Sequence, residues 1–304
     1  MSENKNNFAI GGGLVLAVTF WGGNNAGTKW LLGTWPPVAT GSMRFLTAGF
    51  ILLVGVRIFA PVARGKIPAG VWRSLWLRGG LSLAAYILFY TLALRRIPVS
   101  HVALYLGASP VWALLREGRP RWNLSSAQRY GAALLALAGV FILFWPALQN
   151  GQSNLAGEFL GLLASFTWAN FSRQSRLLTA HVNGVTVAAH SMWMAGVWLL
   201  PFGIYEIATR GIILDAPHLG VQAFCILFGS VVPYAFWNSA LHHWRTSRVM
   251  LFNNFIPLTT TLWAYFLLHE PITPTFCAAM VLIITAVLLG QLNWQKIFNL
   301  PEGF

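Results

Sequence analysis

Long apolar runs, separated by short polar gaps, make up almost the whole chain. A helix rises about 1.5 Å per residue, so about 20 apolar residues cross a hydrocarbon core that is about 30 Å thick. Runs of about this length lie near residues 8–32, 37–56, 74–94, 98–115, 125–147, 157–178, 183–205, 217–241, 247–268 and 272–294. The pattern predicts an all-α membrane protein with ten transmembrane helices.

The composition leads to the same class. Only 9% of the residues are charged, whereas soluble proteins carry charge at about a quarter of their positions. The net charge is +13, but the basic residues lie mostly in the gaps and form no basic helix face with interleaved aromatics, so we expect no nucleic-acid binding. Cys225 and Cys277 lie inside apolar runs, which favours buried thiols over a disulfide framework. The first run is too long for a cleaved signal peptide and is expected to remain as a span.

Basic residues in the gaps predict the orientation of the chain. With a cytoplasmic amino terminus, 15 of the 20 Lys and Arg residues fall on the cytoplasmic side, and Arg44 lies within a span. The other four, on the outer side, are Lys29, Arg95, Arg96 and Arg210. Cytoplasmic loops of membrane proteins carry an excess of Lys and Arg. We therefore expect a multi-pass inner-membrane protein with both termini in the cytoplasm.

The two halves of the chain match each other at one constant offset, without a gap. Trp21 matches Trp168, since 168 − 21 = 147. At the same offset the matches include Lys29 with Arg176, Gly49 with Gly196, Ser100 with Ser247 and Pro110 with Pro257. Each half holds five spans, an odd number, so the second half must enter the membrane from the opposite side. The sequence predicts two inverted five-helix repeats, residues 1–149 and 150–304, around a central cavity. Inverted repeats are typical of alternating-access transporters and also occur in channels.

This arrangement resembles the drug/metabolite transporter superfamily, in its EamA-type branch. The residues that carry the resemblance are a tryptophan late in the first span of each half (Trp21, Trp168), Arg44 in the second span, and the segment Ser247–Pro257 followed by His269-Glu270-Pro271. The resemblance covers essentially the whole chain. In the first half, Pro110 is followed by Arg116-Glu117-Gly118-Arg119 in place of a longer helix ending in Glu-Pro. The most similar members are bacterial inner-membrane exporters of metabolites, including aromatic amino acids, so the resemblance implies secondary transport.

Polar and aromatic side chains inside the spans form stripes at helical spacing. Such groups are costly against lipid and usually face the interior of a bundle. They favour a substrate cavity at mid-membrane, with hydrogen bonding that only joins the helices as the alternative. The expected substrate-binding residues are Trp21, Asn24, Asn25, Tyr86, Tyr90, His101, Tyr105, Ser109, Trp168, Tyr234, Trp237, Asn238 and Asn253. The almost wholly apolar runs 125–147 and 272–294 are expected at the periphery.

Two prolines and one arginine differ from their surroundings within the spans. Pro110 and Pro257 interrupt their helices at symmetry-related positions and are expected to act as hinges, with a static kink as the alternative. Arg44 is the one basic residue well within a span. It can bind a substrate carboxylate as a forked donor, or it can snorkel or brace helix ends, which is the interpretation we favour from sequence.

Acidic residues are missing from the middle of the spans, since Glu158 and Glu270 fall at helix ends. Tight coupling to protons needs a protonatable group at the site, and only histidines such as His101 or His190 remain. We therefore expect transport without an obligatory proton.

The same residues suggest a zwitterionic substrate. Its carboxylate is expected to meet amide N–H groups of Asn24, Asn25 or Asn238. Its ammonium group is expected to meet carbonyls freed at the two prolines.

Motifs of enzymes and cofactor sites are absent, including HExxH, GxSxG, Walker A and CxxC. The pair His242-His243 favours a loop over a metal site. We expect no enzyme activity, no cofactor, no metal and no obligatory protein partner, only the lipid bilayer and a small-molecule substrate. The leading interpretation is an exporter of small amphipathic metabolites, above all neutral or aromatic amino acids. The alternatives are an exchanger of phosphorylated or nucleotide-linked sugars, which needs several cationic residues in the cavity, and a passive solute pore, which needs a continuous polar lining.

Overall fold

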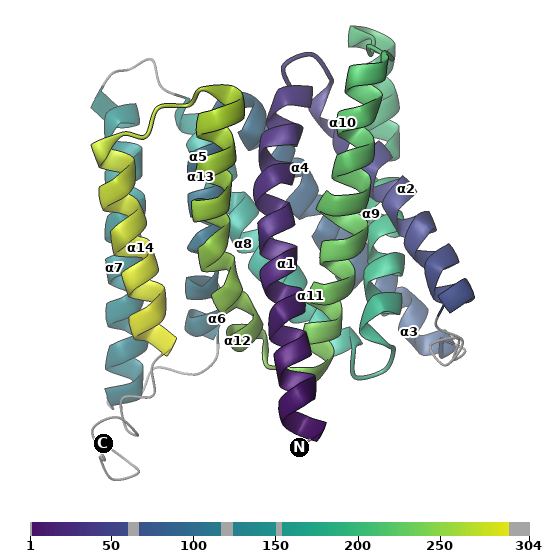
Figure 1. Cartoon of the computed structure of the whole chain (residues 1–304), viewed down its shortest axis with the longest axis horizontal. Coiled ribbons are helices and arrows are strands. Elements are labelled where there is room, and N and C mark those ends of the chain that lie inside the picture. The colour runs from purple at the N-terminus through teal and green to yellow at the C-terminus, as the bar shows by residue number, and fades with distance from the viewer. Residues whose placement is uncertain (1, 60–66, 117–123, 150–153, 292–304) are drawn as a thin grey trace.

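The structure is a computed structural model that describes residues 2–59, 67–116, 124–149 and 154–291, and the described residues are nearly all helical (Figure 1). The first half contains α1 (Ser2–Leu31), α2 (Pro37–Phe59), α3 (Ala69–Ser74), η2 (Leu75–Leu81), α4 (Ser82–Arg96), α5 (Val99–Gly107), α6 (Pro110–Arg116) and α7 (Leu124–Gln149). The second half contains α8 (Leu155–Leu178), α9 (Gly184–Arg210), α10 (Ala216–Ile226), η3 (Leu227–Val231), α11 (Val232–His243), α12 (Thr246–Met250), η4 (Leu251–Asn254), α13 (Phe255–Leu268) and α14 (Pro274–Gln291).

Consecutive elements join into ten spans, which confirms the predicted number and their approximate positions. Four segments of the described chain are long and apolar enough to cross a membrane on their own: 37–58, 69–96, 184–210 and 216–243. The other spans are broken, more polar or less completely described. The chain is a multi-pass membrane protein. Helix α1 begins, and α14 ends, at the same end of the bundle (Figure 1). We call this the proximal end, and the opposite end, where α1 ends and α2 begins, the distal end.

The two halves depart from regular α-helix at corresponding places. The third span of each half contains a π-helical segment, η2 in the first and η3 in the second. The fourth span of each half is also interrupted, between α5 and α6 in the first half and at η4 in the second. These paired irregularities support two inverted copies of one five-helix unit.

Hydrogen bonds repeat this symmetry at the residue level. The ammonium group of Lys29 donates to the carbonyls of Leu94 and Ile97, at 2.6 and 2.8 Å, and so caps the end of α4. Its counterpart Arg176 donates to the carbonyls of Leu241 and His242 and caps the end of α11. The first pair of bonds lies at the distal end and the second at the proximal end, as an inverted repeat requires.

The seam between α2 and α9 depends on two glycines at symmetry-related positions. A Cβ atom on Gly49 would overlap the backbone of Trp193, and one on Gly196 would overlap the backbone of Leu46. Leu46 and Trp193 are themselves 147 residues apart. The backbones therefore approach each other closely, in the way that small residues allow between membrane helices.

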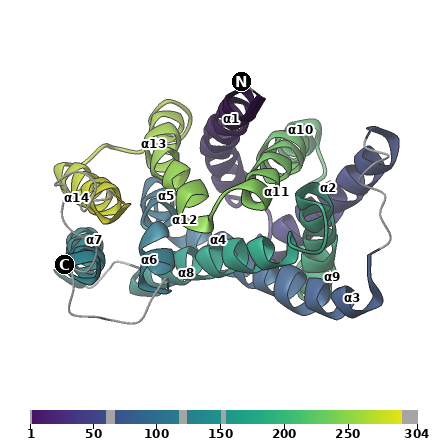
Figure 2. The same cartoon turned by 90° about the horizontal axis from the view of Figure 1, so that it is seen from below.

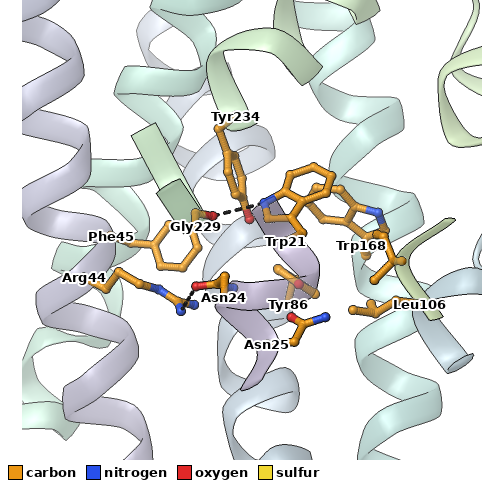
Figure 3. A pocket seen from close by; sticks show the side chains of 11 residues that line it. Trp21, Asn24, Asn25, Arg44, Phe45, Tyr86, Leu106, Trp168, Gly229 and Tyr234 are labelled. Carbon is orange, nitrogen blue, oxygen red and sulfur yellow. Dashed lines mark hydrogen bonds between the residues drawn. The ribbon is translucent and has the colours of Figure 1, made fainter. Parts of the chain in front are cut away.

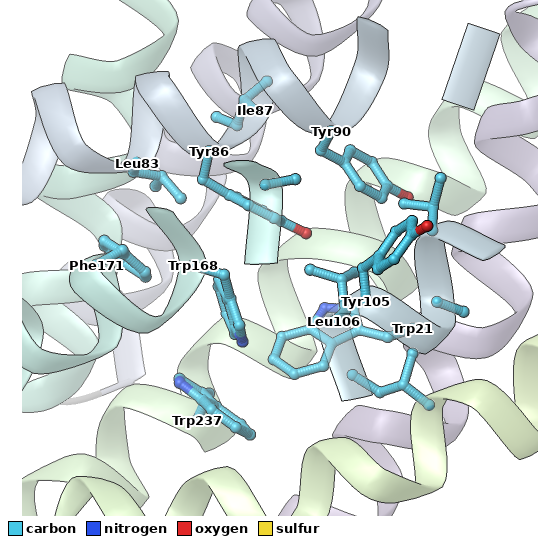
Figure 4. Packing of buried hydrophobic residues seen from close by; sticks show 14 of the residues in the cluster. Trp21, Leu83, Tyr86, Ile87, Tyr90, Tyr105, Leu106, Trp168, Phe171 and Trp237 are labelled. Carbon is cyan, nitrogen blue, oxygen red and sulfur yellow. The ribbon is translucent and has the colours of Figure 1, made fainter. Parts of the chain in front are cut away.

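The outermost helices lie on either side of the central helices. Seen from the proximal end (Figure 2), α7 and α14 lie together at one edge, α3 and α9 lie near the other, and α1, α4, α8 and α11 lie between them. The peripheral placement predicted for runs 125–147 and 272–294 is confirmed. One large apolar cluster fills the centre (Figure 4).

Candidate functional site

A central cavity lies where the two halves meet (Figure 3). Its unfilled space is about 360 Å³, including the mouth. It is lined by Trp21, Asn24, Asn25, Arg44, Phe45, Tyr86, Leu106, Trp168, Gly229, Tyr234 and Ile256. Seven of these belong to the first half and four to the second, so neither half forms the cavity alone.

One wall of the cavity is aromatic. The rings of the symmetry mates Trp21 and Trp168 meet edge-on, with centroids 5.3 Å apart. Tyr86 packs on Trp168 at 5.0 Å, and Tyr234 packs on Trp21 at 5.7 Å (Figure 3). The indole N–H of Trp21 donates to the carbonyl of Gly229 at 3.0 Å, which fixes the ring. Such edge-to-face contacts stabilise rigid apolar surfaces against which a ring can pack.

The other wall is polar and is centred on Arg44, which is only 2% exposed. One guanidinium nitrogen, Nη1, donates to Asn24 Oδ1 at 3.0 Å and to Thr28 Oγ1 at 2.8 Å. The Nε atom has no hydrogen-bond partner in the described structure. The guanidinium carbon lies 4.8 Å from the centre of the Phe45 ring, a cation–π contact. Arg44 is therefore buried and does not snorkel to the interface, while its bonds to α1 agree with the bracing role that the sequence also favoured. A role of Arg44 toward a substrate stays a prediction.

Arg44 faces no acidic partner in the cavity. No lining residue is acidic, and the described salt bridges do not include Arg44. Its present partners are a neutral amide and a neutral hydroxyl. A buried charge without a counter-ion is costly, so this cavity is suited to an anionic group.

Asn25 has a supporting role beside this wall. Its amide donates to Thr260 Oγ1 at 2.9 Å and accepts from the Tyr90 hydroxyl at 2.6 Å. Asn238 uses its amide on the carbonyl of Tyr234 in its own helix. These two amides are therefore already engaged within the bundle, whereas Asn24 lines the cavity beside Arg44.

The other predicted residues surround the cavity without lining it. Tyr90 lies behind Asn25, and Trp237 packs behind Trp21 and Trp168 at 5.2 and 5.4 Å. Ser109 and Asn253 bond to each other at 2.9 Å, between the interrupted fourth spans of the two halves. Nearby, a Cβ on Gly107 would meet the Pro257 ring, so the interruptions near Pro110 and Pro257 pack together.

His101 and Tyr105 face an acidic residue. His101 Nδ1 lies 2.9 Å from Glu158 Oε1, and the Tyr105 hydroxyl donates to Glu158 Oε2 at 2.7 Å. Glu158 lies in the first turn of α8, as its position near a helix end predicted, but it is only 4% exposed. Sequence reasoning missed its burial and its partners. The sequence signal was a lone carboxylate at the start of an apolar run.

Four lining residues were also missed: Phe45, Leu106, Gly229 and Ile256. They are apolar, and no stripe distinguishes them from lipid-facing or core residues. No cluster of metal-ligating side chains occurs in the part of the chain that the structure describes.

The distal end of the bundle is tied by hydrogen bonds between the halves. The Trp35 indole donates to the carbonyl of Ile213 at 2.8 Å, and the backbone N–H of Val38 donates to Glu206 at 2.8 Å. Glu270 accepts from the backbone N–H of Val99 at 2.8 Å and so caps α5. These contacts hold α2 and α5 of the first half against the second half.

Comparison with known proteins agrees with this fold. The sequence profile of the EamA-like transporter family matches residues 12–145 and again 155–290. A protein of Escherichia coli (strain K12) named "Probable amino-acid metabolite efflux pump" is 22% identical over 292 residues, which cover 93% of this chain and 95% of that protein. A Salmonella typhimurium protein of the same name is 24% identical, covering 92% and 94% of the two chains.

An uncharacterized transporter of Archaeoglobus fulgidus is 22% identical over 90% of this chain and 95% of its own length. One solved structure, described only as the crystal structure of a protein, has the same fold with a TM-score of 0.66 at 18% identity. It covers 93% of this chain and 97% of its own. The family profile matches both halves and nearly the whole chain, so this protein belongs to the EamA-like transporter family, in the drug/metabolite transporter superfamily.

Proposed function

We propose that this protein exports small zwitterionic metabolites, foremost amino acids with apolar or aromatic side chains, by alternating access. One observation carries the proposal: a buried guanidinium, Arg44, lacks an acidic partner in a cavity whose other wall is aromatic. The substrate carboxylate would supply the missing negative charge. The substrate side chain would pack against Trp21, Trp168 and Tyr234.

The aromatic wall also suits the positive end of such a substrate. An ammonium group is attracted to the face of an indole or phenol ring, by about 0.5–2 kcal/mol depending on desolvation. The names of two relatives, both probable amino-acid metabolite efflux pumps, support export as the direction of transport. The distribution of basic residues supports an orientation with the distal end outside and both termini in the cytoplasm, in a bacterial inner membrane.

The alternatives from sequence fit the cavity less well. A phosphorylated or nucleotide-linked sugar carries more negative charge, and Arg44 is the single charged residue among those that line the cavity. A passive pore needs a polar path through the whole bundle. Here the distal end is tied by bonds between the halves, and the cavity wall is largely aromatic.

Efflux from proteoliposomes tests the proposal. Vesicles would be preloaded with phenylalanine, tryptophan, lysine or phenylethylamine, which is phenylalanine without its carboxylate. The two aromatic amino acids should leave faster than lysine and phenylethylamine, and Arg44→Gln should remove this advantage. Equal rates for phenylalanine and phenylethylamine, or unchanged phenylalanine efflux in the Arg44→Gln protein, would contradict the role of Arg44.

A further inference from the structure

Two acidic residues of the second half hold helix α5 of the first half at the distal end. Glu270, which follows α13, accepts from the backbone N–H groups of Val99 and Ser100, at 2.8 and 3.3 Å, and from the Ser100 hydroxyl at 3.0 Å. Glu158, in the first turn of α8, accepts from the Tyr105 hydroxyl at 2.7 Å. We call Glu158 and Glu270 the α5 clamp.

Helix α5 depends on this clamp because it has no cap of its own. The first N–H groups of a helix have no partner within the helix. The residue before α5 is Pro98, whose side chain makes no capping hydrogen bond. Glu270 supplies the missing acceptor from the other half of the chain. Loss of a capping acceptor shifts a conformational equilibrium by about fivefold, so movement of α5 away from the second half is disfavoured.

The counterpart of α5 in the second half, residues 246–254, cannot be held in the same way at the proximal end. The offset of 147 residues relates Glu158 to Gly11 and Glu270 to Asn123. Glycine has no side chain to offer, and asparagine is neutral. The repeat symmetry therefore fails at both members of the clamp.

The residues that face the clamp differ between the halves as well. Tyr105 corresponds to Phe252, which has no hydroxyl group to donate. His101, which lies 2.9 Å from Glu158 through its Nδ1 atom, corresponds to Arg248. The guanidinium carbon of Arg248 lies 3.8 Å from the centre of the Trp244 ring in its own half. Acceptors and donors have thus diverged together, and the acidic contacts belong to the distal end.

We propose that the α5 clamp keeps the distal end closed while the cavity is empty. Alternating access needs two conformations that exchange the open end, and exact repeat symmetry would give them equal energies. The clamp breaks this equality in favour of the conformation that is closed at the distal end. The proposal rests on the proposed function only through alternating access. In the proposed orientation, the favoured conformation is the one that takes up substrate from the cytoplasm.

Helix α5 also reaches the cavity, which connects the clamp to substrate binding. Leu106, the residue after Tyr105, lines the cavity. Gly107 ends the helix, and a Cβ atom on it would overlap the Pro257 ring of the other half. A substrate that displaces Leu106 would therefore move the helix that the clamp holds.

A third acidic residue at the distal end provides a matched control. Glu206 of α9 accepts from the backbone N–H groups of Val38 and Ala39 in α2, at 2.8 and 3.1 Å. These two helices are also joined by the seam at Gly49 and Gly196, where their backbones meet. We expect α2 and α9 to move together, so Glu206 should cap α2 in both conformations.

The test measures distances between spin labels by pulsed electron resonance, without substrate. One pair of labelled cysteines, at Arg96 and Tyr205, reports on the distal end. The pair at His243 and Ile58 reports on the proximal end and is related to the first by symmetry, since 243 − 96 and 205 − 58 are both 147. All four side chains are exposed, and the two native cysteines would be replaced by alanine. In the parent protein the distal distance should be mainly short, and shorter than the proximal one.

The variants assign this difference to the clamp. Glu270→Ala should raise the ratio of long to short distal distances by about fivefold. Glu158→Gln, which keeps an acceptor for Tyr105, should raise it by less, and it serves as a second variant if Glu270→Ala does not fold. Glu206→Ala removes an acidic cap from the same end and should leave the ratio unchanged.

Three results would overturn the proposal. They are a distal distance in the parent protein that is as long as the proximal one, an unchanged ratio in both clamp variants, and an equal rise in Glu206→Ala. None of these measurements uses a substrate. Failure of the proposed substrate would instead appear in the efflux assay.

Discussion

At the scale of single residues, the guanidinium of Arg44 is held by two neutral acceptors, Asn24 and Thr28. Replacing one of them by a carboxylate should therefore change how Arg44 binds a substrate. Asn24→Asp places a carboxylate where Asn24 Oδ1 now accepts from the guanidinium at 3.0 Å. The new ion pair should compete with the substrate carboxylate and slow phenylalanine efflux by about tenfold or more, since about 1.4 kcal/mol corresponds to tenfold. Phenylethylamine efflux should not fall. Thr28→Ser, which keeps the hydroxyl acceptor, is the control, and normal phenylalanine efflux by Asn24→Asp would contradict the assignment.

The aromatic wall gives a second prediction at this scale. Trp168→Ala removes ring contacts with Trp21, Tyr86 and Tyr234 and opens one side of the cavity. Efflux of phenylalanine should fall strongly, whereas Trp168→Phe should retain part of it. Trp145→Ala is the matched control, because Trp145 is 47% exposed on the lipid-facing surface. Efflux assays need parallel gel filtration, so that loss of folding is distinguished from loss of the site.

At the scale of elements, the two capping residues Lys29 and Arg176 are equivalent by symmetry. Each bonds a pair of carbonyls at the end of one helix. Lys29→Ala and Arg176→Ala should therefore cost similar stability, about 1.5–3 kcal/mol each, as for hydrogen bonds to charged groups. Arg96→Ala should cost much less, because exposed Arg96 donates only to its own helix. Denaturant unfolding in detergent micelles measures all three, and a large difference between the first two would contradict the equivalence.

At the scale of the whole molecule, the seam between the halves should tolerate no added atom at Gly49. Gly49→Ala puts a Cβ against the backbone of Trp193, and backbone cannot move aside as a side chain can. We expect a marked loss of thermal stability. Gly55→Ala, in the same helix with nothing within 4 Å, should be neutral or slightly stabilising. Equal melting temperatures for the two variants would show that the seam is looser than described.

The orientation of the whole molecule is tested separately. A cysteine at Gly151, which lies outside the described residues, should react with a membrane-impermeant thiol reagent added from the periplasmic side. Reaction only from the cytoplasmic side would reverse the orientation inferred from the 15 basic residues against four.

Hydropathy predicted the spans, and the constant offset of 147 residues predicted the repeat. Both signals are found along the sequence and need no knowledge of which helices touch. The cavity was predicted only in part. Trp21 and Trp168 line it, but Trp237 lies behind them, since helical periodicity does not fix how far each helix is rotated. The burial of Glu158 depends on a helix from the other half, which no local pattern contains. For Arg44, no local pattern shows that α1 provides acceptors for the guanidinium, so its burial could not be predicted.

The matched bonds of Lys29 and Arg176 mean that these helix caps keep their places when the bundle is turned over. A chain inserted in the opposite orientation would still form these helix caps, the glycine seam between α2 and α9, and the contact between the Trp21 and Trp168 indoles. The fold therefore gives the inserting cell almost no information about which face should point inward, and that decision rests on the loops. Exchanging a few loop charges should yield the same protein in reversed insertion.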